Sequence, residues 1–363
     1  MNIPRATLLQ IPSGSSSLFF KAARKQQQLV TALTQRYDLW GYLPIHTPLL
    51  DFARPYQAII PEQDSNRIYH LIGRDGEILM LRWDITLFLV KQIHRLLPDT
   101  KLPLRLSYAD SILRHQAALD ISHNEFFQTG VELIGSAGPD GDLEVVLLLA
   151  ESLQTIGVSA VVHIGSAGLF HAAFGTLPAE TQTSLSLAIV ERNWRQFAEL
   201  LQNHPTIDGP SLQTCFATIC EAAALPEIEF VAKPLPPAVA LEFNTTMSLV
   251  QEAQRLYPKT IFRLDLSELG SQQYHSGVVF QAYAEGYDSA VAMGGRYDRL
   301  LSKMGIDQPA VGFSIMLSKI SSQLANSDVD SEPMVDLSQN PEGFVDRFRK
   351  AQTLRAKNQR VCL

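Results

Sequence analysis

The clearest alternation of apolar and polar residues lies in the middle of the chain. Leu104, Leu106 and Tyr108 alternate with polar residues, which predicts a half-buried strand. After a mostly polar break at His115–Asn124, the run Glu125–Leu133 alternates again. Two such strands joined by a loop predict a long antiparallel hairpin.

The expected hairpin carries polar side chains on one face. Arg114 stands where the first strand ends, and Gln128 and Glu132 are four residues apart on the second. Residues four apart in a strand share a face, so a guanidinium, an amide and a carboxylate are expected on one side of the sheet. A plain solvated sheet face is the alternative at this point.

Apolar spacing predicts further helices and strands on both sides of this hairpin. Leu18–Tyr37 has the pattern of an amphipathic helix, and the proline-containing stretch Gly41–Asp51 predicts an edge strand. A second hairpin is expected around Gly73–Gly76, followed by a helix, Leu87–Leu97, with Thr86 as its N-cap. The later predictions are a helix at Asp142–Gly157, strands at Ala160–Ile164, Ile261–Leu266 and Val278–Tyr283, and mostly helical structure over 178–255.

The composition indicates a soluble globular protein and narrows the class of partner. Of the 363 residues, 46% are apolar and 18% are charged, so a core is easily buried. The most apolar run, Val145–Ala150, is too short to span a bilayer, and no secretory signal is found, which predicts a cytoplasmic protein without membrane contact. The three cysteines form neither a disulfide framework nor a zinc pattern, and Cys215 and Cys220 are expected inside a helix. The formal net charge of −7 weighs against a nucleic-acid partner, because phosphate contacts dominate nucleic-acid affinity.

Several motifs together resemble the class II aminoacyl-tRNA synthetases in their histidyl form. Glu125–Glu132 (EFFQTGVE) is similar to the EFxQxGxE strand of motif 2, which follows an arginine and a loop. Gly41–Asp51 resembles the dimer-forming motif 1, and Gly312–Ile320 falls where motif 3 belongs. The resemblance covers roughly residues 10–320, and the order of the motifs is more specific than any single match. It implies an α+β fold, a mainly antiparallel sheet flanked by helices, with residues 178–255 inserted.

The resemblance also implies an amino-acid pocket. The stretches LRWDIT (81–86), YHSG (274–277) and GGRYD (294–298) match places that contact the amino acid in the family, with His275 where a second tyrosine is usual. The candidate ligand-binding residues are Asp84, Thr86, Arg114, Gln128, Glu132, Tyr274, His275 and Tyr297. No catalytic residue, cofactor or metal ligand is predicted.

Plain structural roles are the alternatives for several of these residues. Asp84 and Thr86 could belong to a capped helix start that binds nothing, and Tyr297 could sit in a turn that Arg296 and Asp298 fix by ion pairing. His123 and His163 have no partner motif beside them, so they are expected to be ordinary surface or core histidines.

The same resemblance indicates which catalytic groups this sequence lacks. A class II site activates an amino acid by attack of its carboxylate on the α-phosphate of ATP, which requires fixed guanidinium groups around the phosphates. Arg114 supplies one, but Lys319 and Gly270 stand where the family has two more arginines. Ser318 and Gln116 replace acidic neighbours. Each lost contact costs about 3 kcal/mol of transition-state stabilisation, and a lysine does not reproduce a bidentate contact, so no amino-acid activation is expected.

A synthetase-like core without the activating arginines resembles the regulatory subunits of ATP phosphoribosyltransferase, the histidyl-synthetase paralogues of histidine biosynthesis. Residues 186–201 (SLAIVERNWRQFAELL) also resemble a helix of that family. The family implies a non-catalytic subunit that forms a homodimer within a hetero-oligomer with the short catalytic subunit. It also implies support of that subunit's activity and feedback control by histidine, without tRNA binding. A divergent histidyl-tRNA synthetase is the rival hypothesis, and a freestanding amino-acid-binding domain is a third.

The chain is expected to contain one large unit and a short C-terminal piece. Residues 1–320 are predicted to form the synthetase-like core, and the Ser-, Asn- and Asp-rich segment 321–343 is predicted to be a flexible linker. Residues 344–363 resemble only the opening helix and strand of a synthetase anticodon-binding domain and are interpreted as its remnant.

Overall fold

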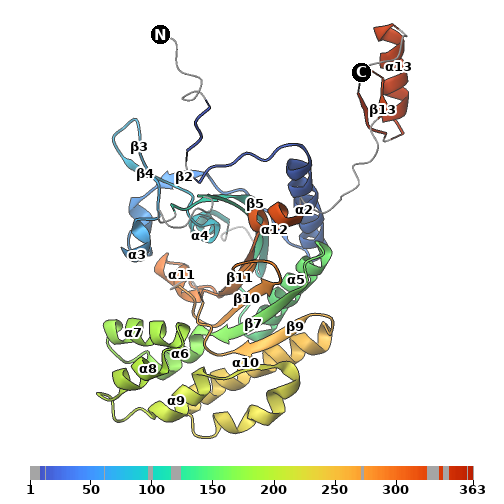
Figure 1. Cartoon of the computed structure of the whole chain (residues 1–363). Helices are drawn as coiled ribbons and strands as arrows, with labels where there is room; N and C mark the ends of the chain where they lie inside the picture. The colour runs from blue at the N-terminus through green and yellow to red at the C-terminus, as the bar shows by residue number, and fades with distance from the viewer. Residues whose placement is uncertain are drawn as a thin grey trace.

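A nine-stranded sheet forms the centre of the computed structural model (Figure 1). The structure describes residues 9–12, 14–60, 62–96, 101–115, 124–270, 274–324, 335–337, 343–357 and 359–362. In spatial order the strands are β1 (Leu43–Pro44), β5 (Leu104–Leu113), β6 (Glu125–Ile134), β12 (Ala310–Met316), β11 (Ala292–Arg296), β10 (Val278–Ala284), β7 (Ala160–Ser166), β9 (Ile261–Asp265) and β8 (Ile219–Glu221). Neighbouring strands are antiparallel except in the β1–β5 and β7–β9 pairs. The predicted α+β fold with a mainly antiparallel sheet is confirmed.

The hairpin predicted in the middle of the sequence is the β5–β6 pair, and it lies inside this sheet. Its register runs from Leu104 opposite Ile134 to Leu113 opposite Glu125. Strand β12 pairs with the other edge of β6, so the polar residues of β6 stand on a central strand rather than at an edge. Residues 116–123, which include Gln116 and His123, lie outside the described part of the chain.

The two faces of the sheet differ because side chains alternate along each strand. On one face, apolar residues such as Val131 and Phe313 join the main hydrophobic core. Their neighbours, such as Glu132 and Gly312, therefore turn to the opposite face. The core face is covered by α2 (Phe20–Leu39), α5 (Pro139–Thr155), α10 (Pro237–Leu256) and α12 (Leu317–Leu324).

A second, smaller core lies on the opposite face, at the β5 end of the sheet. Leu106 of β5 packs there with Phe88 of α4 (Ile85–Leu96) and Leu300 of α11 (Asp298–Lys303). This core supports the segment around α4 beside the polar residues of β6. The result is a sheet whose second face is apolar at one end and carries polar groups next to it.

Residues 178–255 are mostly helical but also extend the central sheet. Strand β8 pairs with β9 and forms the last strand of the order. Cys220 lies in β8, so its predicted place in a helix was wrong, whereas Cys215 lies in α9. The helices of the segment are α7 (Ala179–Val190), α8 (Trp194–Leu201), α9 (Gly209–Phe216), η3 (Ala222–Ala232) and α10. The boundaries of this segment as an insertion stay a prediction.

The remaining elements flank the sheet or follow it. Strands β2 (Leu50–Phe52), β4 (Ile78–Leu81) and β3 (His70–Ile72) form a small antiparallel sheet, and β13 (Val335–Asp336) pairs in parallel with β14 (Val361–Cys362). Because β13 lies within 321–343, the described part of that segment contains regular structure, and the linker stays a prediction. The short helices are η1 (Arg54–Tyr56), α3 (Glu62–Ser65), α6 (Ala167–Phe174) and α13 (Phe344–Arg355). None of the described helices has the length and apolar character needed to cross a bilayer.

A buried arginine fastens the small sheet to the central hairpin. Arg82 follows β4 and is 2% exposed. Its guanidinium donates to the backbone oxygens of Thr47 (2.7 Å) and Ser111 (2.8 Å) and forms an ion pair with Asp110 of β5. A buried charge is tolerated only when it is paired and hydrogen-bonded. These contacts therefore hold three separate segments in one arrangement.

Replacing Arg82 by methionine should lower the free energy of unfolding by about 3 kcal/mol, because the buried acceptors lose their donors. Urea denaturation measures the change. Arg105→Met is a matched control, since Arg105 pairs bidentately with Glu144 but is 31% exposed. It should cost no more than about 1 kcal/mol. Equal losses in the two variants would contradict a special role for Arg82.

Candidate functional site

The structure brings all eight residues predicted for the pocket to one cavity. It lies on the sheet face opposite the main helical layer, and its enclosed volume is about 40 Å³. The predicted residues that line it are Asp84, Thr86, Arg114, Gln128, Glu132, Tyr274, His275 and Tyr297. This volume holds about three water molecules, so the cavity is narrow.

Glu132 occupies the centre of the cavity, on the central strand β6. Its side chain is 1% exposed, and it accepts hydrogen bonds from Thr86 Oγ1 (2.6 Å) and from the hydroxyl of Tyr297. Gly312 lies opposite it on β12, and a β-carbon there would overlap Oε2 of Glu132. Burial raises the pKa of Glu132 to about 8, against the lowering effect of its two hydroxyl donors. Glu132 is therefore mostly protonated at neutral pH.

Asp84 links the start of α4 to the only guanidinium that lines the cavity within the described part of the chain. Its Oδ1 accepts from the backbone N–H of Leu87 (3.0 Å), and its Oδ2 lies 3.4 Å from Arg114 Nη2. The predicted helix cap at Thr86 was wrong, because Asp84 caps α4 and Thr86 turns its hydroxyl to Glu132. Arg114 also donates to Trp83 O (3.0 Å) and lies over the Trp83 ring. Burial lowers the pKa of Arg114, but an arginine stays charged in this setting.

Aromatic rings close the opposite side of the cavity. Tyr274 lies edge-on to Tyr297 and to His275, with ring centroids 6.1 and 5.3 Å apart. Burial lowers the pKa of His275 to about 4, so its ring is neutral at physiological pH. Its Nδ1 has no hydrogen-bond partner among the described residues. Gln128 donates to Met316 Sδ (2.9 Å) and presents its amide to the cavity.

Neither Lys319 nor Gly270, which replace the expected activating arginines, lines this cavity, although Gly270 lies against His275, which does. Lys319 contacts Ser289 and Asp288 at the surface. Ser318 accepts a hydrogen bond from the backbone of Phe127, and Gly270 lines a different cavity. Among the described residues, Arg114 supplies the one guanidinium that lines the pocket. No group of three metal-binding side chains is found in the described part of the chain. The arrangement can hold a small ligand with nitrogen donors, but it lacks the charge to grip a triphosphate.

Sequence reasoning missed part of the lining. Strand residues Tyr108, Met293, Ser314 and Met316 and the glycines at 294, 295 and 312 also line the cavity. The glycines were visible as a signal, because glycine inside a strand often marks a close approach. His163, expected to be unremarkable, lies outside this cavity and hydrogen-bonds Asp265. The hydroxyl of Tyr297 donates to Glu132 within the cavity, and Arg296 also pairs with Asp298 as the alternative proposed.

The fold and the polar pocket define a class II aminoacyl-tRNA synthetase-like protein. The family model described as histidyl-tRNA synthetase matches residues 16–320. A structure described as an ATP phosphoribosyltransferase regulatory subunit/histidyl-tRNA synthetase from Bacillus halodurans is similar, with a TM-score of 0.81 at 24% identity, covering 98% of this chain and 92% of that one. At that identity the match shows the fold, which both functions share.

Comparison with curated sequences separates the two. The ATP phosphoribosyltransferase regulatory subunit of Moorella thermoacetica is 30% identical over 336 residues, 86% of this chain and 81% of the relative. A structure of the ATP phosphoribosyltransferase HisG:HisZ complex from Thermotoga maritima matches with a TM-score of 0.60 at 20% identity, covering 79% of this chain and 96% of that one. The chain belongs to the family of ATP phosphoribosyltransferase regulatory subunits, which share the histidyl-tRNA synthetase fold.

Proposed function

We propose that this chain is the non-catalytic regulatory subunit of an ATP phosphoribosyltransferase in histidine biosynthesis. It supports the activity of a short catalytic subunit and contributes to feedback control by histidine. The observation that carries the proposal is the composition of the pocket. The amino-acid side, with Glu132, Thr86 and Tyr297 in direct contact, is assembled, whereas the phosphate side has Arg114 alone among the described residues.

The divergent synthetase is the second candidate, and the fold itself favours neither. Amino-acid activation needs several preorganised cations around the transferring phosphate. Arg114 is already engaged by Asp84 and by the backbone of Trp83. A single engaged guanidinium supports binding of a small ligand better than it supports phosphate chemistry.

The ligand of the pocket is inferred to be histidine. An ammonium group would replace the proton that Glu132 holds at neutral pH, and an imidazole would contact the aromatic side formed by Tyr274 and His275. The cavity of about 40 Å³ is smaller than an amino acid, so binding requires side chains to move outward. Because opening costs free energy, weak binding by the isolated chain is expected.

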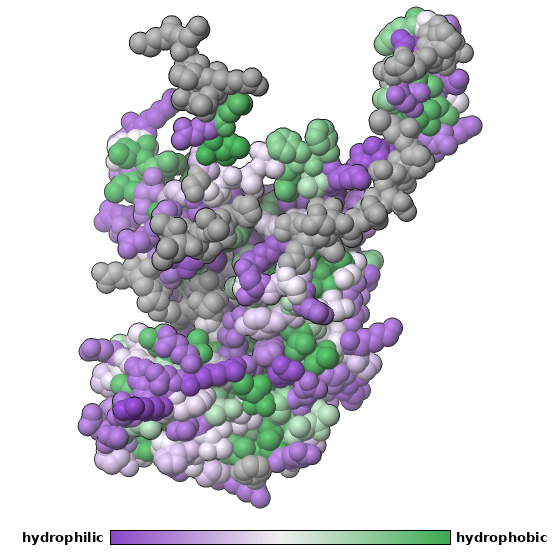
Figure 2. Space-filling model, viewed as in Figure 1, coloured by the Kyte–Doolittle hydropathy of each residue, from purple (hydrophilic) through white to green (hydrophobic). Residues whose placement is uncertain are grey.

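An apolar surface supports the proposal of a homodimer. Leu39 at the end of α2, Leu43 of β1 and Leu49 are 50–76% exposed, and Figure 2 shows hydrophobic surface over the neighbouring β2–β4 sheet. Exposed apolar surface of this kind can form a contact between protein chains. They lie in the segment that resembles the dimer-forming motif 1, so a second copy of this chain is the proposed occupant.

The function is tested by reconstitution with the short catalytic subunit. We expect the phosphoribosyltransferase rate of that subunit to rise when this chain is added. We expect ATP–pyrophosphate exchange with histidine by this chain at least a hundredfold below a synthetase rate, since preorganised charges are missing. Exchange at an ordinary synthetase rate, with no effect on the phosphoribosyltransferase, would establish the rival function.

Histidine binding to the isolated chain is tested by calorimetry. Glu132→Ala should weaken binding about tenfold or more, because a charge-assisted hydrogen bond is lost. Glu199→Ala is the control, since that carboxylate forms only an exposed pair with Arg195. Glu132 is protonated in the free pocket and charged beside an ammonium, so binding should release a proton and strengthen as the pH rises toward 8. Equal affinities of the two variants would place histidine elsewhere.

The homodimer is tested by light scattering of the isolated chain. Leu43→Asp should shift the chain toward the monomer mass, because a charge in an apolar contact is poorly tolerated. Leu241→Asp is the matched control, since Leu241 is a similarly exposed leucine (66%) on α10. A monomeric wild-type chain, or the same mass for both variants, would contradict the proposed dimer contact.

A further inference from the structure

A second cavity lies on the same sheet face as the pocket, beyond the strand β11 that lines the pocket. It encloses about 450 Å³, which is larger than the pocket around Glu132. Its floor is built from β7, β9 and β10, where His163 pairs in register with Gln281 on one side and with Arg263 on the other. The loop after β9 and the turn after α7 form its walls. The lining residues are His163, Val190, Arg192, Asp265, Ser267, Glu268, Gly270, Gln281 and Tyr283.

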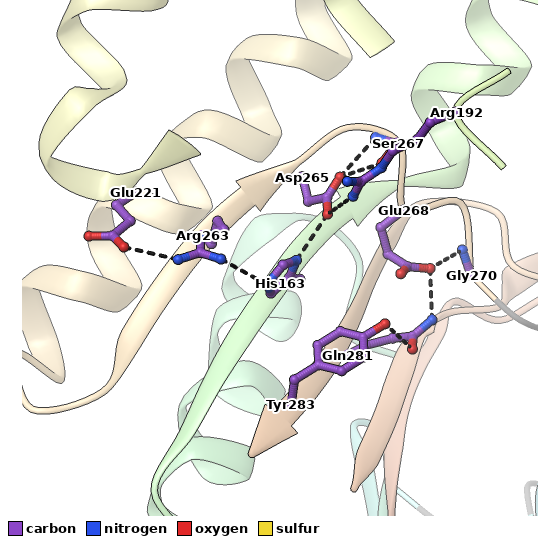
Figure 3. Close-up of polar contacts among 10 residues, drawn as sticks. All are labelled: His163, Arg192, Glu221, Arg263, Asp265, Ser267, Glu268, Gly270, Gln281 and Tyr283. Atoms are coloured by element: carbon purple, nitrogen blue, oxygen red, sulfur yellow. Dashed lines mark hydrogen bonds and ion pairs between the residues drawn. The ribbon is translucent and has the colours of Figure 1, made fainter. Parts of the chain in front are cut away.

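Asp265 organises one side of this cavity (Figure 3). Its Oδ2 accepts from His163 Nδ1 (2.9 Å) and Arg192 Nη2 (3.2 Å), and its Oδ1 accepts from Ser267 Oγ (2.6 Å) and Ser267 N (3.2 Å). Arg263 Nη1 lies 3.5 Å from the other ring nitrogen of His163. Asp265 already accepts four hydrogen bonds, so it has no capacity left for a ligand.

Arg192 is placed by a backbone conformation that ordinary residues avoid. It has a φ of 54°, and it follows α7 at the position where a Schellman motif prefers glycine. The motif is formed by Arg192 N donating to Ile189 O (2.9 Å) and Asn193 N donating to Ala188 O (2.8 Å). The arginine side chain is 52% exposed, and Nε and Nη2 are directed at Ser267 and Asp265. Its remaining terminal nitrogen is the donor available to an anionic group.

Glu268 faces the cavity without a cation. Its Oε1 accepts from the backbone N–H of Gly270 (3.0 Å) and from Gln281 Nε2 (2.8 Å), and it forms no ion pair within the described residues. Burial raises the pKa of this carboxyl. Gln281 in turn accepts from the hydroxyl of Tyr283, which fixes the orientation of its amide. A half-buried carboxylate with two neutral donors is suited to a cationic partner.

We propose that this cavity is a second ligand site, which takes a small amino-acid-like zwitterion. The ligand's ammonium group contacts Glu268, and its carboxylate contacts Arg192. Phosphorylated ligands fit less well, because one guanidinium stands against two carboxylates. A metal ion fits less well too, since no described group offers three metal-binding side chains. This proposal stands independently of the histidine pocket.

The test is calorimetry on the full chain with the protein L-amino acids one at a time and with the corresponding amino-acid amides, which lack the carboxylate. At least one amino acid should bind saturably, and its amide should bind about tenfold more weakly or not at all. Glu268→Gln should weaken that binding to a similar degree. Glu221→Gln is the matched control, because Glu221 pairs with Arg263 and does not line the cavity.

Arg192→Gly separates a structural role from a binding role. Glycine relieves the left-handed backbone conformation, so the midpoint of urea denaturation should stay the same or rise while amino-acid binding falls about tenfold or more. Glu132→Gln should leave this binding intact. The proposal is overturned if no amino acid binds, if Arg192→Gly and Glu268→Gln bind as the wild type does, if the amides bind equally well, or if Glu132→Gln removes all binding.

Discussion

The guanidinium of Arg82 is the contact on which the arrangement of the pocket depends. It is buried where the chain leaves β4, and it joins the Thr47 segment, the end of β5 and its own strand. The next residues along the chain, Trp83 and Asp84, hold Arg114 through a ring face and a carboxylate. A charge removed from water enforces one geometry on its neighbours, since every alternative leaves it unpaired. The buried contacts of Arg82 therefore fix the position of the pocket wall, although Arg82 itself does not line the pocket.

The pocket proposed for histidine is contracted around its own side chains. Thr86 and Tyr297 satisfy Glu132, and Arg114 and Tyr274 contact Asp84. The carboxylates that a ligand would use already have internal partners, whereas Nδ1 of His275 has none among the described residues. A ligand must replace these contacts, so its presence and absence correspond to two different arrangements of the same residues. An equilibrium between two arrangements is what a regulatory protein requires.

The sequence specified the strands and the pocket members well, for a physical reason. Side chains alternate along a strand, so Gln128 and Glu132 had to share a face once β6 was identified. Contacts made by residues distant in sequence were harder to foresee. The pairing of β8 with β9 depends on how 178–255 packs. Asp84 rather than Thr86 caps α4, because the hydroxyl of Thr86 donates to Glu132, which is distant in sequence. Asp265 is bonded by His163, Arg192 and Ser267, which come from three separate segments, and no local sequence pattern predicts these contacts.

The backbone and surroundings of Gly270 restrict which residue this position can hold. It stands where the synthetase resemblance places an arginine, with a φ of 84°, and a β-carbon there would collide with Nδ1 of His275 and with Val279. Any other side chain at 270 would meet both a disfavoured backbone conformation and an occupied space. A single codon change could restore the arginine in the sequence, but the ring of His275 would also have to give way. Positions 270 and 275 are therefore coupled by packing, and an arginine at 270 would require the ring of His275 to move as well.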